Sequence, residues 1–232
     1  MNEPVISGET RTGQAFRQAF VQHRSFSVLQ RFIRAKPPME RCDLCGAALI
    51  ADHQHLVEVA VRKLICACDG CALLFPGQEK SKYRRVPRRI LLLSDFQLSD
   101  AQWDELLIPI NMAFFFQSTP AGKVLALYPS PAGPTESLLD LRAWNDVVQK
   151  NSILRRMEPD VEALLVNRVK RLDGDSRHDY YLVPIDWCYK LVGLIRAHWR
   201  GLSGGTEVWN EVEGFFADLR NRSSSLRMET RA

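Results

Sequence analysis

Two pairs of cysteines, Cys42–Cys45 and Cys68–Cys71, constrain this chain more than any other feature. Each pair has the spacing C-x-x-C, in which a tight turn lets both sulfur atoms point toward one metal ion. Gly46 follows the first pair, and glycine permits the positive φ angle that such a turn often requires. The separation of the pairs along the chain suits two turns that close on one tetrahedral ion. We therefore expect a metal site of four cysteines, with zinc as the metal.

A fifth cysteine and two histidines lie between the pairs and leave the ligand set open. Cys66 precedes Cys68 by two residues, so on a strand both side chains would face the same way. Three roles are open for it: an alternate ligand, a thiol beside the site, or a core residue. Clustered cysteines also hold iron–sulfur clusters, so such a cluster is the alternative cofactor to zinc. His53 and His55 could replace a thiolate, but four cysteines suffice, and we expect both histidines to face solvent. Cys188 is alone in an apolar segment and should pack in the core.

The composition is that of a globular protein, because 46% of the 232 residues are hydrophobic and 25% are charged. The N-terminal segment lacks the apolar region of a signal peptide, and no apolar run in the sequence is long enough to cross a membrane. C-x-x-C pairs in such a chain indicate reduced, metal-binding thiols rather than disulfides. We therefore expect a cytoplasmic protein without a membrane span.

The formal net charge is +4, and the excess of basic residues peaks at residues 80–89, which read KSKYRRVPRR. A cysteine motif next to such a run resembles the electrostatic footprint of a nucleic-acid-binding protein. Only one aromatic residue, Tyr83, interrupts the run, whereas proteins that bind single strands use several aromatic rings. We therefore favour a solvated linker or a basic surface for an acidic protein, and expect no nucleic acid partner.

The hydrophobic pattern divides the chain into five segments. The first, residues 1–38, contains an amphipathic helix over 10–35 that ends at two prolines. The second, 39–77, is the cysteine module, in which alternating valines predict a β-hairpin between the two pairs. The others are a basic linker over 78–89, an α+β domain over 90–220 and a disordered tail over 221–232.

The fold of the cysteine module is constrained by the residues that follow Cys71, the last cysteine of the two pairs. Only Ala-Leu-Leu-Phe separates Cys71 from Pro76, and proline ends a helix. That stretch is too short for the long helix of a treble clef. We therefore predict a small zinc-ribbon-like module.

The α+β domain contains a pattern that occurs twice, two strands around a turn followed by a helix. The first copy has apolar strands within 111–128 and a helix that ends near Trp144. The second has strands within 161–184 and a helix that leads to Trp199. We therefore predict an antiparallel sheet with helices on one face, built from a degenerate ββα repeat. A last helix is expected over 206–219.

The sequence contains no recognisable set of catalytic residues. Walker loops, dinucleotide-binding glycine patterns, nucleophile elbows and H-E-x-x-H motifs are absent from it. Carboxylates near expected helix starts, such as Glu136 and Asp186, are explained by capping and by the helix dipole. We therefore expect that the protein is not an enzyme.

One glycine-rich turn, WRGLSGGT at 199–206, is a candidate anion site. Its glycines open a helix, where free backbone N–H groups can hold an anion. The residues concerned are Arg200, Gly204, Gly205 and Thr206. The alternative, which we favour, is a helix–helix connection in which a glycine ends one helix and a serine or threonine caps the next.

Several blocks of sequence are distinctive when taken together. They include CDLCG at 42–46, CACDGCALLF at 66–75, YPSPAG at 128–133, EALLVNR at 162–168 and WRGLSGG at 199–205. Over roughly residues 28–220 the chain resembles a family of uncharacterised bacterial proteins whose genes lie beside high-affinity, oxygen-tolerant nickel–iron hydrogenases. The resemblance implies a functional context, namely an accessory, assembly or electron-transfer role around a hydrogenase. It identifies no catalytic residue.

We therefore expect a non-enzymatic accessory protein with a metal knuckle, which binds a hydrogenase subunit or a maturation factor. One alternative is an iron–sulfur redox protein of the same system. The other is a zinc-dependent regulator that binds nucleic acid through the basic run.

Overall fold

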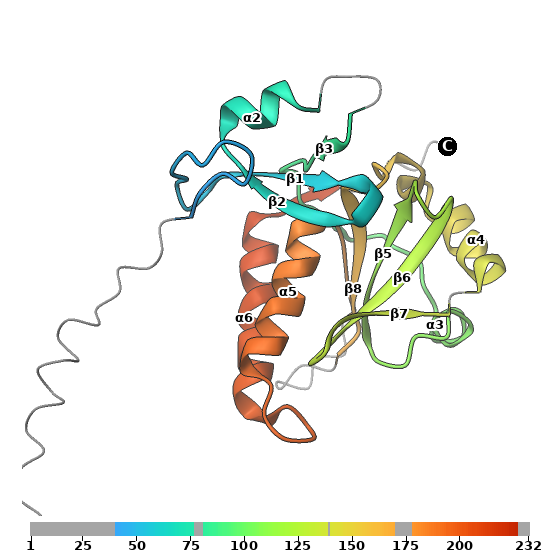
Figure 1. The fold of residues 1–232 in the computed structure, drawn as a ribbon. Coiled ribbons are helices and arrows are strands. Elements are labelled where there is room, and N and C mark those ends of the chain that lie inside the picture. Colours follow the sequence, from blue (N-terminus) through green and yellow to red (C-terminus); the bar gives the residue numbers. More distant parts are fainter. Residues whose placement is uncertain (1–39, 77–80, 139, 170–177, 227–232) are drawn as a thin grey trace, which may run out of the picture. The chain divides into compact units, whose positions relative to one another are not determined.

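The structure is a computed structural model, and it describes residues 40–76, 81–138, 140–169 and 178–226 (Figure 1). The amphipathic helix expected over 10–35 lies outside these residues. The described residues belong to one compact unit that begins at Glu40. This unit contains helices and two mainly antiparallel sheets, so the α+β class is confirmed.

A small sheet contains two strands of the cysteine module, which is residues 40–76 as described here, and one strand from the basic run. Its strands are β1 (Gln54–Glu58), β2 (Lys63–Ala67) and β3 (Tyr83–Arg85), in the order β2-β1-β3. The 3₁₀ turn η1 (Val59–Val61) joins β1 to β2, and helix α2 (Asp69–Leu74) follows β2. The hairpin predicted between the cysteine pairs is therefore confirmed.

The large sheet has seven strands, in the order β10-β4-β9-β8-β5-β6-β7. Their bounds are β4 Leu91–Leu93, β5 Met112–Ser118, β6 Lys123–Ser130, β7 Gly133–Ser137, β8 Glu162–Asn167, β9 Asp179–Pro184 and β10 Ser224–Leu226. The helices are α3 Asp100–Glu105, α4 Leu141–Lys150, the 3₁₀ helix η2 Ser152–Arg156, α5 Ile185–His198 and α6 Gly205–Arg222. Among the described residues, no helix combines the length and the apolar character that crossing a membrane requires.

All neighbouring strands of the large sheet are antiparallel except β10 and β4, which are parallel. Strand β10 lies within the segment expected to be a disordered tail. It is ordered because it pairs with β4, and Ser224 N–H donates to Ile90 O at 3.0 Å. Helix α6 also extends to Arg222, so the prediction of disorder is wrong for residues 221–226.

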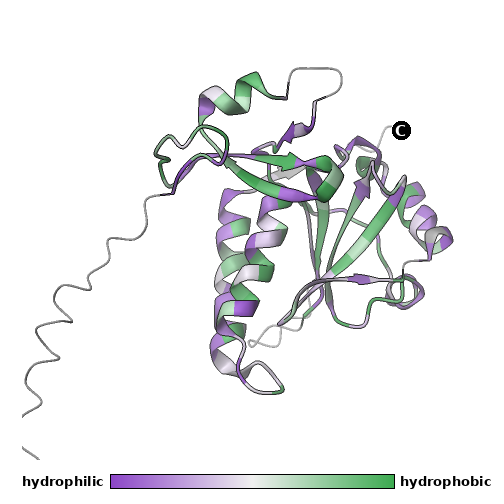
Figure 2. Ribbon diagram, in the orientation of Figure 1, coloured by the Kyte–Doolittle hydropathy of each residue, from purple (hydrophilic) through white to green (hydrophobic). Residues whose placement is uncertain are grey.

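Helices cover both faces of the large sheet, not one face as predicted. Neighbouring residues of a strand point to opposite faces. In β5, Phe114 packs with Leu191 of α5 and Val212 of α6, whereas Phe115 packs with Trp103 of α3 and Trp144 of α4. Strands β5, β8 and β9 are buried on both faces, and β5 and β8, which are largely apolar in sequence, appear as hydrophobic stretches in Figure 2.

The two halves of the large sheet are not copies of one ββα unit. The second half follows the prediction, with β8, β9 and α5 in succession. In the first half, a third strand, β7, follows β6, and α4 begins only at Leu141. Trp144 therefore lies near the start of α4, whereas Trp199 follows the end of α5. The matching spacings in the sequence do not correspond to matching elements.

Candidate metal centre

The first cysteine pair lies in a tight turn, residues 42–46, which we call the knuckle. Gly46 N–H donates to Cys42 O at 2.8 Å, and Cys42 N–H donates to Ala47 O at 2.8 Å. Gly46 has a φ of +75°, as its place after the pair predicted. The Asp43 carboxylate accepts the Cys66 N–H at 2.8 Å, and Asp43 N–H donates to Cys66 O at 2.9 Å. These bonds fix the knuckle to β2.

The second cysteine pair lies at the start of α2 instead of in a second knuckle. Cys68 is the residue before the first turn of the helix, with φ −74° and ψ 162°, and Cys71 lies within that turn. The order of knuckle, hairpin and helix is that of a treble clef with a helix of 6 residues. The zinc-ribbon-like form of the module is therefore not confirmed, because the start of α2 presents Cys68 and Cys71.

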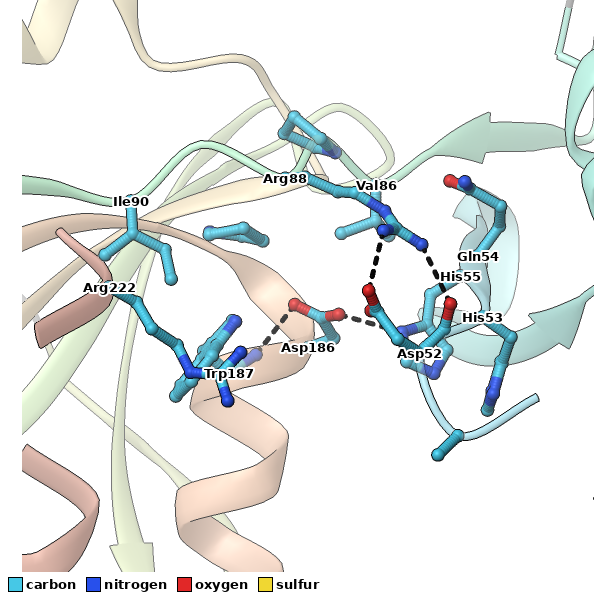
Figure 3. Close-up of a pocket in the computed structure, with 13 residues that line it drawn as sticks. Asp52, His53, Gln54, His55, Val86, Arg88, Ile90, Asp186, Trp187 and Arg222 are labelled. Atoms are coloured by element: carbon cyan, nitrogen blue, oxygen red, sulfur yellow. Dashed lines mark hydrogen bonds and ion pairs between the residues drawn. The ribbon is translucent and has the colours of Figure 1, made fainter. Parts of the chain in front are cut away.

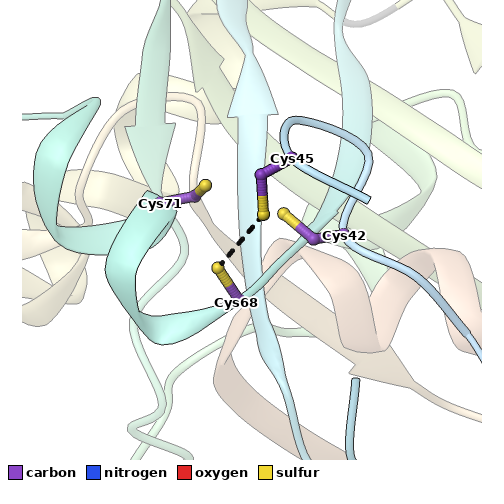
Figure 4. Close-up of side chains that lie close together, drawn as sticks. All are labelled: Cys42, Cys45, Cys68 and Cys71. Carbon is purple, nitrogen blue, oxygen red and sulfur yellow. Dashed lines mark hydrogen bonds between the residues drawn. The ribbon is translucent and has the colours of Figure 1, made fainter. Parts of the chain in front are cut away.

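The sulfur atoms of Cys42, Cys45, Cys68 and Cys71 all lie within 4.8 Å of one another (Figure 4). Cys45 Sγ and Cys68 Sγ are 3.7 Å apart. Tetrahedral zinc with Zn–S bonds of about 2.3 Å separates its sulfur ligands by about 3.8 Å. The predicted cluster of four cysteines is therefore confirmed as a group that could hold a metal ion. Zinc as its metal stays a prediction.

The environment of the cluster favours ionisation of the Cys42 thiol over that of the Cys71 thiol. Burial opposes ionisation of Cys42, but backbone hydrogen bonds from Cys68, Leu44 and Cys45 outweigh it and lower the pKa of Cys42 to about 6. Burial, reinforced by hydrogen bonds with the other thiols, raises the pKa of Cys71 to about 12. Thiols so close together cannot all ionise without a cation, so metal binding must displace protons from them.

A small apolar core lies around the cluster. Cys42 and Cys71 are buried in it with Leu56, Ile65 and Ala72, whereas Cys45 is exposed. The next residue of β1, Val57, points to the opposite side and belongs to the core beneath α5 and α6. The cysteine module therefore has its own core and is also attached to the large domain.

A second group of metal-binding side chains consists of His53, His55 and Cys66. One ring nitrogen of each histidine and the Cys66 sulfur lie within 4.8 Å of one another. The histidines do not face solvent as predicted, because their side chains are only 7% and 24% exposed. Nδ1 of His53 lies 2.9 Å from Ile50 O, and Nδ1 of His55 lies 2.8 Å from a carboxylate oxygen of Asp186.

A cavity of about 340 Å³ lies against these two histidines (Figure 3). Its polar lining also includes Arg88, Asp186 and Arg222. One oxygen of the Asp186 carboxylate accepts from the Trp187 N–H at 2.9 Å, near the start of α5. The other oxygen lies 2.8 Å from Nδ1 of His55. The sequence pattern did not indicate this second contact, because the two residues are 131 positions apart.

The arginines of the basic run form ion pairs within the fold. The distances are 3.5 Å from Arg84 to Asp160, 3.0 Å from Arg88 to Asp52 and 2.5 Å from Arg89 to Glu162. Strand β3 also lies in this run, so the interpretation of residues 78–89 as a linker is wrong for the part that the structure describes. The absence of a nucleic acid partner stays a prediction.

The glycine-rich turn at 199–206 joins α5 to α6. Arg200 donates through its guanidinium to Ala197 O at 3.1 Å and Trp199 O at 3.0 Å, the carbonyls that end α5. No side chain caps α6, so the expected serine or threonine cap is not formed, and Gly204 occupies the cap position. These contacts are those of a helix–helix connection. Anion binding by Arg200, Gly204, Gly205 and Thr206 stays a prediction.

Replacing Gly204 by alanine should destabilise the protein by roughly 2–4 kcal/mol. Gly204 has a φ of +87°, and a Cβ there would lie 2.8 Å from Val208 Cγ1 and 3.1 Å from the Trp199 ring. Urea unfolding measures the loss. Gly214→Ala is the matched control, because Gly214 lies inside α6 with no atom within 4 Å of its added Cβ. It should stabilise the helix by about 1 kcal/mol, and equal effects of both changes would contradict the packing argument.

The fold and the site define an α+β protein with a tetra-cysteine cluster that could hold a metal ion. Residues 41–223 match the model of a family described as a family of unknown function (DUF5947), and the chain belongs to that family. The match extends from the residue before Cys42 to the residue after α6, so it covers both the cysteine module and the α+β domain of this chain. No match is found among curated proteins or among solved structures.

Proposed function

We propose that this protein is a metal-knuckle accessory protein that acts by binding a protein partner and catalyses no reaction. The cluster of four cysteines is the observation that carries the proposal. A zinc ion with four thiolate ligands has no open position for a substrate and is therefore structural. Such an ion would fix the knuckle, the hairpin and α2 relative to one another and so form a rigid surface.

Exposed apolar side chains on the cysteine module support binding to a protein. Leu73 and Leu74 at the end of α2 are 68% and 73% exposed, and Phe75 follows them with its ring also exposed. Figure 2 shows this end of α2 as hydrophobic. Large apolar side chains that gather on one exposed element are typical of protein–protein interfaces.

The partner that we propose is a hydrogenase subunit or a maturation factor, and the role is assembly, maturation or electron-transfer coupling of a nickel–iron hydrogenase. The resemblance of the sequence blocks supports this choice. The exposed surface next to the cysteine cluster is apolar. Such a surface suits a protein partner better than an anionic polymer such as a nucleic acid. The ion pairs of Arg84, Arg88 and Arg89 also reduce the charge that the basic run could offer to phosphates.

Affinity-tagged protein should recover a hydrogenase subunit or maturation factor, and deletion of the gene should lower hydrogen uptake without affecting unrelated metalloenzymes. Leu74→Asp should abolish the recovery, because it places a charge in the apolar surface. Leu202→Asp is the control, since Leu202 is fully exposed in the 199–206 turn, outside the cysteine module. Unchanged hydrogen uptake after deletion, without a hydrogenase protein among those recovered, would refute the proposed partner.

An iron–sulfur cluster is the second candidate for the cysteine site. The exposed position of Cys45 favours it, because a cluster held there would lie close to the surface, where electrons can be exchanged. Metal analysis of anaerobically purified protein separates the two. Zinc without visible absorbance supports a structural site, whereas stoichiometric iron with visible absorbance would make the protein a redox carrier.

A further inference from the structure

Hydrogen bonds determine which nitrogen of His53 and of His55 carries the proton. Ile50 O can only accept, so Nδ1 of His53 must donate to it at 2.9 Å. The Asp186 carboxylate likewise accepts from Nδ1 of His55 at 2.8 Å. In the neutral rings, the lone pair therefore lies on Nε2. A metal-bound histidine typically has this pattern, in which its other nitrogen donates to a carbonyl or a carboxylate.

Nε2 of His53 is buried and, in the part of the chain that the structure describes, has no hydrogen-bond partner. The His53 side chain is only 7% exposed, so this nitrogen is shielded from bulk solvent. An unpartnered lone pair in the interior needs an explanation, because buried polar atoms are nearly always paired.

We infer that His53, His55 and Cys66 form a second metal site for a divalent transition ion of intermediate softness, such as zinc. One ring nitrogen of each histidine and the Cys66 sulfur lie within 4.8 Å of one another, and the group has no residue in common with the tetra-cysteine cluster. Bonds of about 2.0–2.3 Å place ligand atoms about 3.5 Å apart, so an ion would draw these three groups closer together than the 4.8 Å within which they lie. Imidazole and thiolate together suit zinc and its neighbours in the first transition row.

The second site differs from the first in having an open position. Three protein ligands leave one corner of a tetrahedron for water or another small ligand. The cavity of about 340 Å³, which both histidines line, is large enough to admit one. Asp186, which orients His55, also lines this cavity, so the carboxylate, the histidine and the proposed ion form one connected unit (Figure 3).

Zinc per chain, measured on the full-length protein, tests the site. The wild type should bind two ions, and His53→Ala, His55→Ala and Cys66→Ser should each reduce the content to one. His198→Ala should keep two, because His198 pairs with Glu207 at the other end of α5 from Asp186. Asp186→Asn should weaken the affinity of the second site for zinc by about 10- to 100-fold and leave the first site filled.

X-ray absorption at the zinc edge distinguishes this inference from the proposed function. The wild type should show sulfur and nitrogen ligands, and His53→Ala should show sulfur ligands alone. One zinc ion per wild-type chain with only sulfur ligands would overturn the second site and leave the tetra-cysteine site intact. Cys45→Ser should unfold the module that carries both sites and remove both zinc ions, so the histidine variants are the ones that isolate the second site.

Discussion

Cys71→Ser should release the metal from the tetra-cysteine site and unfold the cysteine module. Serine cannot supply the thiolate that zinc requires, and the apolar core around the cluster is small. In zinc-finger peptides, the metal supplies about 10–16 kcal/mol of apparent binding free energy that is also folding free energy. Amide hydrogen exchange should show loss of protection in β1, β2 and α2, while β5, β8 and β9 stay protected. Elemental analysis should show loss of the zinc of the tetra-cysteine site, together with the zinc of the second site, whose residues lie in the same unfolded module.

Cys188→Ser is the matched control for this prediction. Cys188 is fully buried in α5 and packs in the main core, as its sequence context predicted. The change introduces the same hydroxyl at a buried position, so it should lower stability without altering zinc content. Cys71→Ser protein that keeps its zinc and its module would show that the ligand set is wrong, with Cys66 as the replacement to examine.

Short-range patterns in the sequence predicted the cysteine cluster well. The C-x-x-C spacing places two sulfur atoms together regardless of the rest of the fold, and Gly46 marks the turn. The same spacing occurs at a helix start, however, where Cys68 and Cys71 lie. The motif therefore predicts which cysteines meet but does not distinguish a second knuckle from a short helix.

The two edge strands of the large sheet escaped prediction. Strand β7 contains Gly-Pro-Thr-Glu-Ser, which lacks an apolar alternation, because it is an edge strand with much of its surface exposed. Strand β10 begins with two serines and forms because β4 offers it a free edge. In both, tertiary pairing overrides weak local preference.

The candidate second site shows the same limit. His53, His55 and Cys66 are close in the sequence, and their chemistry was recognised, but the pattern did not predict their burial. Burial follows from the contact of β1 with α5, through His55 and Asp186, which only the folded chain reveals. His55, which would be exposed in a lone hairpin, thus becomes partly buried and is oriented by a carboxylate when the hairpin packs on the domain.

Arg89→Ala should lower the free energy of unfolding by roughly 2–4 kcal/mol, far more than an average surface change. Glu162 is fully buried and accepts from Arg89 Nε at 2.5 Å, from Arg89 Nη2 at 2.7 Å and from Glu158 N–H at 2.9 Å. Without the guanidinium, a buried carboxylate would lose its counter-charge. The Arg89 side chain is itself 40% exposed, which keeps the loss below that of a fully buried pair. Urea unfolding measures it.

Arg88→Ala provides the comparison within the same basic run. Arg88 pairs with Asp52 at 3.0 Å, but both side chains are exposed, so its loss should change stability by only about 0–1 kcal/mol. Replacing Arg89 and Glu162 together by methionine should recover most of the stability lost in Arg89→Ala, because an apolar pair leaves no unpaired charge in the interior. Equal and small losses for Arg88→Ala and Arg89→Ala would instead mean that residues 81–89 behave as the solvated linker that their charge suggests. A large loss confined to Arg89 identifies this arginine as the point where the basic run is anchored to the large sheet.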